Sequence, residues 1–220
     1  DAAQAAKHLA TGFKKGDVVH LRLGVSPLVS ATKVAGVLNG VQQAVPSLEL
    51  TLGVGMDAKL VDEAVAGDLD LFIAGDDTEL PERVHSWTLS REPMVAVMSP
   101  AHELAAKETL TPGDLDGVDM IELANCPIAA RFTQMCLDAG AKPNFRKRVA
   151  SCDQVFSLVR EGLGVAILPR SVVAGTDLVA KPIDGTNIER AITLGTVAGR
   201  RFSPAADAFV KLARTRDWAT

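Results

Sequence analysis

The amino-acid sequence predicts an α/β protein made of two Rossmann-like lobes with a cleft between them. Residues 19–74 show three strand patterns that alternate with two helix patterns, and residues 118–168 show a second set of the same kind. Because a crossover helix forces the strands that it joins to run in one direction, each set predicts a parallel sheet. Two lobes joined by crossing segments form a cleft, where small ligands bind.

The first lobe is predicted from periodic valines and leucines. They alternate with polar residues in the opening strand, which runs to Ser26, and then recur at helical spacing until Pro46 ends the helix. Asp57 is the expected N-cap of the next helix, and Gly67 lies just past its end. The predicted elements are strand 19–26, helix 29–45, strand 48–55, helix 56–67 and strand 69–74.

The regular alternation breaks at Val84, which is typical of a crossover between lobes. Two strands, at 84–90 and 92–99, precede a turn-rich segment. The second lobe and the return of the chain then give strand 118–123, helix 128–139, strand 145–150, helix 152–161, strand 165–168, strand 191–197 and a final amphipathic helix that includes Ala206, Phe209, Val210 and Ala213.

The stretch "VREGLGVAILPRSVV" contains the end of one helix, a short buried strand and a turn. Ser151 and Gln154 form a predicted capping box at the start of that helix. Gly162 supplies a left-handed residue at the helix end, and Gly164 eases entry into the strand. Pro169 lies where the strand must leave the sheet.

Composition excludes several classes of function. The 220 residues are 47% hydrophobic, with a net charge of −4. No apolar run approaches the roughly 20 residues of a membrane span, and the N-terminal residues do not resemble a signal peptide. The densest basic cluster, Arg146–Arg148 with Lys142 nearby, is too short for a DNA-binding surface. Three irregularly spaced cysteines are typical of free thiols in a reducing compartment.

Several segments, in order, resemble the effector-binding domain of LysR-type transcriptional regulators over residues 17–215. The stretch around Gly162 resembles the family's "aaGlGvallP" element. The others are "VVHLRLGVSP", "VAGDLDLFIAG", "REPMVAVMSPAHELA", "LTPGDLDGVDMIEL" and "CLDAGAKPN". The sequence departs from the family pattern at Glu103, because the family usually has proline after the residue that corresponds to His102.

The resemblance implies a fold similar to type 2 periplasmic binding proteins, and an effector-sensing function without enzyme activity or cofactor. By this resemblance, residues 1–16 match the end of a linker helix. Regulatory lobe I consists of residues 17–96 together with residues 190–220, and regulatory lobe II consists of residues 97–189. A winged-helix DNA-binding domain would precede residue 1, and DNA would be bound only through it. The protein is expected in the cytoplasm, away from membranes, as a homodimer or homotetramer in which helices 29–45 and 57–66 pair between subunits.

The effector, expected to be a small anion or carboxylate, should bind where strands end and helix N-termini begin. Such ends lie at Ser26-Pro27-Leu28, Asn125-Cys126-Pro127 and Ser151-Cys152-Asp153. Plain helix capping is the alternative interpretation of the hydroxyl and amide side chains. The resemblance supports Asn125 and Ser151 as pocket walls. The candidate effector-binding residues are Ser26, Pro27, Leu28, Ser30, Gly75, Asn125, Cys126, Ser151, Cys152 and Pro169.

Cys126 and Cys152 allow a second interpretation, as thiol sensors of oxidants. Each follows an expected N-cap, where the helix dipole lowers a thiol pKa. A peroxide-sensing branch of the family uses cysteines near the first position with a partner nine residues on, whereas Cys136 lies ten residues after Cys126 and is expected in the core. Neither cysteine has a nearby histidine in the sequence, so metal sensing is disfavoured and no metal site is expected.

Two other classes of protein remain as alternatives. A transport solute-binding protein would share the fold, and an α/β enzyme would need a catalytic or cofactor motif. "GVGMDA", at Gly53–Ala58, fits GxGxxA with Asp76 about 20 residues on, but a tight turn also explains its glycines. The four histidines, which belong to no recognisable catalytic or metal motif, are His8, His20, His85 and His102.

Overall fold

The computed structural model describes residues 18–75, 79–124, 126–185 and 188–218. The chain divides into two compact units, each with its own core. Unit 1 contains residues 1–91 and 191–220, and unit 2 contains residues 92–190. The chain passes between the units twice, along β4 (Val84–Met98) and β9 (Glu189–Val197). The predicted helix at 1–16 lies outside the described residues.

Unit 1 is built on a parallel sheet, as the alternating pattern predicted. Leu21 of the central strand lies opposite Leu50 of one neighbour, and Leu23 lies opposite Leu71 of the other. The last strand of the chain then joins the sheet in antiparallel fashion. The elements are β1 (Val19–Val25), α2 (Ala31–Ala44), β2 (Leu48–Val54), α3 (Asp57–Ala66), β3 (Leu71–Gly75) and α7 (Pro204–Thr215), with the strand order β2-β1-β3-β9.

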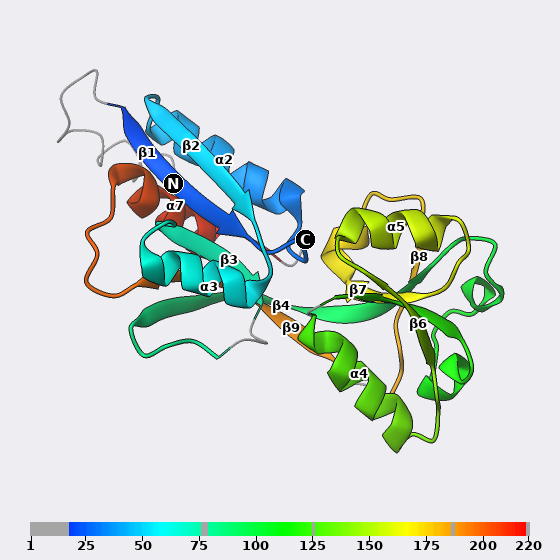
Figure 1. Ribbon diagram of the computed structural model, residues 1–220. Helices are drawn as coiled ribbons and strands as arrows, with labels where there is room; N and C mark the ends of the chain where they lie inside the picture. The colour runs from blue at the N-terminus through cyan, green and yellow to red at the C-terminus, as the bar shows by residue number, and fades with distance from the viewer. Residues whose placement is uncertain (1–17, 76–78, 125, 186–187, 219–220) are drawn as a thin grey trace. The chain divides into compact units, whose positions relative to one another are not determined.

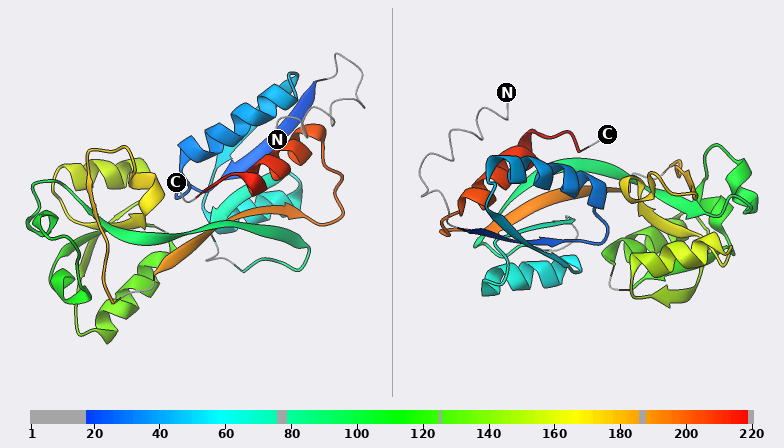
Figure 2. Two further views of the ribbon diagram at one scale, coloured as in Figure 1. Left: turned by 180° about the vertical axis from the view of Figure 1, so that it is seen from behind. Right: turned by 90° about the horizontal axis from the view of Figure 1, so that it is seen from above.

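Helices cover both faces of this sheet. The helices α2 and α7 pack on one face and α3 packs on the other, which is visible from two directions (Figures 1 and 2). The α2 and α7 helices approach closely because α2 has glycines where they meet. A Cβ atom at Gly40 would lie 3.0 Å from Leu212 of α7, and one at Gly36 would overlap the Arg216 guanidinium. The two layers bury Leu21, Leu23, Val37, Val41 and Phe209 on the first face, and Leu60, Ala64 and Phe72 on the second.

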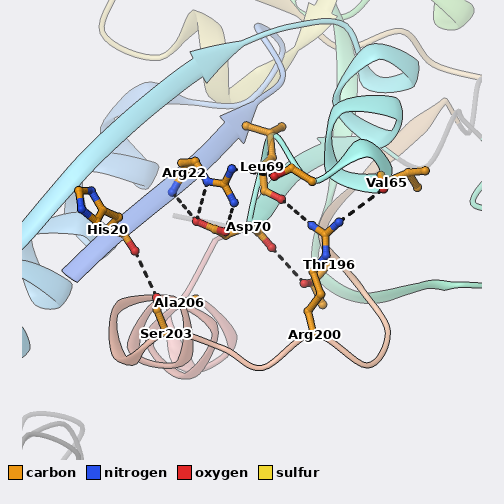
Figure 3. A network of polar contacts seen from close by, with 10 residues as sticks. His20, Arg22, Val65, Leu69, Asp70, Thr196, Arg200, Ser203 and Ala206 are labelled. Atoms are coloured by element: carbon orange, nitrogen blue, oxygen red, sulfur yellow. Dashed lines mark hydrogen bonds and ion pairs between the residues drawn. The ribbon is translucent and has the colours of Figure 1, made fainter. Parts of the chain in front are cut away.

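A polar network joins the strands at the amino end of β3 (Figure 3). The Arg22 guanidinium donates to Asp70 Oδ1 at 2.7 Å, and its backbone N–H donates to Asp70 Oδ2 at 2.8 Å. Arg22 also donates to the Gly67 carbonyl, and Arg200 donates to the Leu69 carbonyl. The network therefore fixes the loop between α3 and β3 from two sides.

Unit 2 combines a small parallel sheet with the distal part of β4. The register places Leu123 opposite Val149, so β5 and β6 end side by side. The core contains Phe132 and Cys136 of α4 with Met120. The elements are η2 (Glu103–Ala106), η3 (Pro112–Leu115), β5 (Asp119–Leu123), α4 (Pro127–Asp138), β6 (Asn144–Val149), α5 (Cys152–Arg160), β7 (Ala166–Pro169), α6 (Arg170–Val173) and β8 (Val179–Lys181).

Local signals in the sequence are confirmed at several helix ends. Ser151 and Gln154 make the predicted capping box, and Gly67 and Gly162 both have positive φ. A Cβ atom at Gly164 would lie 2.6 Å from the Asp119 carbonyl oxygen, so the strand entry requires glycine.

Two local predictions are wrong. The strands expected at 84–90 and 92–99 are one strand, β4, because exposed Pro93 does not interrupt it. The N-cap of α3 is Met56 rather than Asp57, whose carboxylate has a different partner.

No helix in the described part of the chain is long and apolar enough to span a membrane. Two of the basic residues of β6, Lys147 and Arg148, pair with acids of β5. Lys147 Nζ lies 2.7 Å from Asp119, and Arg148 Nε lies 2.9 Å from Glu122. These charges are thus engaged along the sheet rather than gathered into a basic surface.

Candidate functional site

The candidate residues of unit 1 gather at the carboxyl end of β1. Ser26 is 1% exposed, and its N–H donates to the Ile73 carbonyl at 2.8 Å, which ties the end of β1 to β3. Ser26 Oγ accepts from the Leu28 N–H at 3.4 Å. The structure therefore holds the turn 26–30 in place before α2 begins. Leu28 is buried, whereas Pro27 and Ser30 are half-buried.

Ser30 is the N-cap of α2, but its side chain makes no capping hydrogen bond to the helix. An N-cap hydroxyl usually accepts from an N–H of the first turn. The alternative of plain capping therefore does not describe Ser30 in this structure, and the first-turn N–H groups of α2 lie beside the buried end of β1.

Gly75 ends β3, and its N–H donates to Asp57 Oδ2 at 2.9 Å. Asp57, the first residue of α3, is buried. Its carboxylate thus connects the start of α3 to the end of β3, close to the predicted site in unit 1. The sequence indicated this acid only as an N-cap, because a contact across 18 residues leaves no local pattern.

In unit 2, the candidate residues gather at the carboxyl ends of β5 and β6. Cys126 lies three residues after Leu123, Cys152 lies three residues after Val149, and these two strand residues are paired. Cys126 is the N-cap of α4, and Ser151 is the N-cap of α5. The structure therefore brings two of the three helix N-termini named in the sequence analysis to the ends of neighbouring strands. Asn125 lies outside the described residues.

The environment of Cys152 opposes the predicted thiol chemistry. Burial raises the pKa of the Cys152 thiol to about 11, although the charge of Arg190 acts in the opposite direction. Cys136 is buried in the core as predicted, and burial raises its thiol pKa to about 11 as well. The expectation of a lowered pKa is wrong for Cys152, because loss of solvent outweighs the helix dipole.

Cys126 lines a small pocket between α4 and the strands of unit 2. Its volume is about 20 Å³, which holds a water-sized group rather than an effector. The pocket is mostly apolar; its other lining residues include Leu123, Ala129, Phe132, Phe145 and Leu168.

Pro169 ends β7 opposite Met94 of β4, and α6 follows at once. Beside it are two buried charged residues that the sequence analysis missed, Glu92 and Arg190. The Ser171 N–H donates to Glu92 Oε2 at 3.1 Å. An acid within an apolar strand is the only local signal of this cluster, because its members are distant in the sequence.

Among the described residues, no group of three or more His, Cys, Asp or Glu side chains is placed to hold a metal ion. His20 is exposed beside Glu49, and His102 accepts from the Leu104 N–H through Nδ1 at 3.2 Å. His85 is exposed on β4, and His8 and Asp76 lie outside the described residues.

Residues 14–218 match the protein family described as the LysR substrate binding domain. YvbU, an uncharacterized HTH-type transcriptional regulator of Bacillus subtilis, is 26% identical over 215 residues, which cover 96% of this chain and 72% of YvbU. YwbI, another such regulator of B. subtilis, is 24% identical over 169 residues, which cover 74% of this chain and 54% of YwbI. This chain thus spans between about half and three quarters of these relatives.

Two solved structures show the same fold. The effector binding domain of QuiR in complex with shikimate has a TM-score of 0.78 at 18% identity, over 90% of this chain and 96% of that one. The regulatory domain of CcmR from Synechocystis PCC6803, in complex with 2-PG, has a TM-score of 0.76 at 19% identity, over 89% and 95%.

Proposed function

Because this chain belongs to the LysR substrate binding domain family, we propose that it is the effector-sensing domain of a transcriptional regulator. A small molecule binds the domain and favours one of its conformational states, and that change reaches a DNA-binding domain that precedes residue 1 in the full-length protein. Units 1 and 2 are the proposed regulatory lobes. In this proposal the effector changes the DNA binding of the full-length protein, and the domain catalyses no reaction. Because the regulated DNA is in the cytoplasm, we propose that the protein acts there.

The observation that supports this proposal best is the arrangement of Ser26 and Ser30. A buried strand end meets the N-terminus of a 14-residue helix whose N-cap hydroxyl makes no capping bond. The first-turn N–H groups and the positive end of the helix dipole favour an anionic group there. Pro27, Leu28 and Gly75 shape the same end of the sheet.

Unit 2 has a similar arrangement, in which the N-termini of α4 and α5 follow the ends of two paired strands. The candidate residues in this unit are Cys126, Ser151, Cys152 and Pro169. We assign these residues to the effector as well. The class of effector is a small anion or carboxylate, because helix N-termini are the shared feature of both ends. The solved relative that binds shikimate supports a carboxylate ligand.

Calorimetric titration and thermal unfolding test the proposal with shikimate and a panel of small carboxylates. At a ligand concentration of 100 Kd we expect about 2.7 kcal/mol of stabilisation. The double variant Ser26→Ala with Ser30→Ala should lose most of the binding, whereas Ser157→Ala, at an exposed site in α5, should bind normally. Equal binding by all three proteins would contradict the assigned site.

We also propose that the domain assembles as a homodimer or homotetramer. The edge strand β2 supports this, because Leu50, Leu52 and Val54 are exposed on one side of it. An exposed apolar edge strand is a surface that a second chain covers. Pairing through the helices near 29–45 and 57–66 stays a prediction.

A further inference from the structure

Three polar residues form a row across the first part of unit 2, and we call Ser171, Glu92 and Arg190 the polar row. Met94 lies opposite Pro169, and the Met94 N–H donates to the Ile188 carbonyl at 2.9 Å. Two residues back along β4, Glu92 lies opposite Arg190 of the neighbouring strand β9. On its other side is Ser171 of α6, whose N–H donates to the Glu92 carboxylate. Residues that face each other on neighbouring strands have side chains on the same face.

The polar row is buried in an apolar setting. Glu92 is 5% exposed and Arg190 is 1% exposed. Alternate residues of β4 share a face, so Glu92 continues the row of Ala96 and Met98, which belong to the core of unit 2. A carboxylate there loses its hydration and needs hydrogen bonds in exchange.

Those hydrogen bonds are incomplete. Glu92 Oε2 accepts from the Ser171 N–H, but Glu92 Oε1 and Ser171 Oγ are both buried without a hydrogen-bond partner in the described part of the chain. The two unpaired atoms belong to residues that are in direct hydrogen-bond contact through the Ser171 N–H and Glu92 Oε2, so both lie at one place in the fold. Buried polar atoms are nearly always paired, so an unpaired pair of this kind indicates a missing binding partner.

The polar row lies next to the proposed effector site. Ser171 lies two residues after Pro169, which is one of the proposed effector residues and lies opposite Met94. The positive charge of Arg190 also acts on the thiol of Cys152, the first residue of α5, in the direction that lowers its pKa. The positive charge of Arg190 and the N-terminus of α5 both attract an anion. Glu92, by contrast, accepts hydrogen bonds and repels a second anion.

We infer that the polar row selects a hydroxy acid: Arg190 and the N-terminus of α5 bind its carboxylate, and its neighbouring hydroxyl donates to Glu92 Oε1 and accepts from Ser171 Oγ. A hydroxyl matches both unpaired atoms, since it donates once and accepts as well. An ammonium group donates to Glu92 but cannot accept the serine proton. This inference rests on the proposed function, and it names the chemical class of the effector.

The test compares ligands that differ at one carbon, namely malate with succinate and aspartate, and lactate with propionate and alanine. Calorimetry on the wild-type domain should give at least tenfold tighter binding for the hydroxy acid in one or both sets. Glu92→Gln and Ser171→Ala should each reduce this ratio to below about threefold. Glu189→Gln, an exposed neighbour of Arg190, is the matched control and should keep the ratio.

Ser171→Ala removes only a hydroxyl, so it remains informative if Glu92→Gln unfolds. Equal affinity for succinate and malate in the wild type would overturn the inference and leave the proposed effector function intact. Preference for aspartate would overturn the choice of a hydroxyl. Absence of binding by all six ligands would also overturn the hydroxy-acid inference, whereas the proposed function fails only if the shikimate and carboxylate screen is negative as well.

Discussion

The carboxylate of Asp57 accepts a hydrogen bond from the backbone N–H of Gly75 at 2.9 Å. This bond joins the first residue of α3 to the last residue of β3 and leaves Asp57 buried. A backbone N–H at a strand end has no further strand partner, so it needs an acceptor when solvent is excluded. Asp57 supplies that acceptor and thereby holds the end of β3 beside the start of α3.

We expect Asp57→Ala to destabilise the domain by about 1–3 kcal/mol, because it leaves the Gly75 N–H buried without its acceptor. Asp57→Asn keeps an acceptor oxygen and should therefore lower the free energy of unfolding by less than Asp57→Ala does. Urea unfolding measures both, with Asp62→Ala, an exposed acid of the same helix, as the control. A loss for Asp62→Ala as large as for Asp57→Ala would contradict this role.

The Arg22–Asp70 pair should make stability depend on pH. Burial alone would raise the pKa of Asp70, but hydrogen bonds from the Arg22 side chain and backbone outweigh it, so the pKa lies below its usual value. The pair's contribution is therefore complete above the unfolded pKa of about 3.9 and is lost as the pH falls through the lower folded value.

We expect Asp70→Asn to lower the free energy of unfolding by about 1–2 kcal/mol at pH 6. The difference in this free energy between the variant and the wild type should become smaller below about pH 4. Denaturant unfolding from pH 6 to pH 2 measures both changes. Asp68→Asn, at an exposed neighbouring position, should show no such gap. A constant difference between Asp70→Asn and wild type over this range would show that Asp70 acts without its charge.

Elements with local patterns could be predicted from the sequence. Periodic valines located β1 and α2, and the capping box of Ser151 and Gln154 located the start of α5, because these signals lie within a few residues of each other. The parallel order followed, since crossover helices leave few choices of topology.

Side-chain partners from distant parts of the chain could not be predicted. Glu92 and Arg190 are almost 100 residues apart, and they lie opposite each other only because β4 and β9 are neighbours in the sheet. The pKa of Cys152 was expected in the wrong direction for the same reason. The helix start is visible in the sequence, whereas the residues that bury the thiol are not.

Gly164→Ala should destabilise the domain by about 1–3 kcal/mol, because the new Cβ would lie 2.6 Å from the Asp119 carbonyl oxygen. Backbone on both sides must move to relieve the overlap. Gly53→Ala is the matched control, since nothing lies within 4 Å of its Cβ position. Thermal unfolding should separate the two variants, and equal melting temperatures would mean that the strand entry adapts.

Alkylation of the folded protein at pH 7 should be slow at Cys136 and Cys152. A thiol with a pKa of about 11 is ionised in about one molecule in 10⁴ at this pH, and both are also buried. Mass spectrometry after a timed iodoacetamide reaction should find label mainly on the half-buried Cys126. All three should react in urea. Rapid native labelling of Cys152 would restore the thiol-sensing interpretation.

Replacement of Leu52 by aspartate should dissociate the assembled protein. Leu52 is 50% exposed and Val54 is 68% exposed on the edge strand β2. Both lie on the face of the sheet that carries α2, because their partners Leu23 and Val25 pack there. A charge on this apolar surface must lose its hydration if a second copy covers it.

Sedimentation velocity over a range of concentrations measures the assembly. We expect the wild type to sediment as a dimer or tetramer and Leu52→Asp to sediment as a monomer. Thr51→Asp introduces the same charge on the opposite face of β2 and should stay assembled. Circular dichroism must show that Leu52→Asp is folded. A folded Leu52→Asp variant that stays assembled would exclude β2 as the contact, because an unpaired buried charge there should cost several kcal/mol.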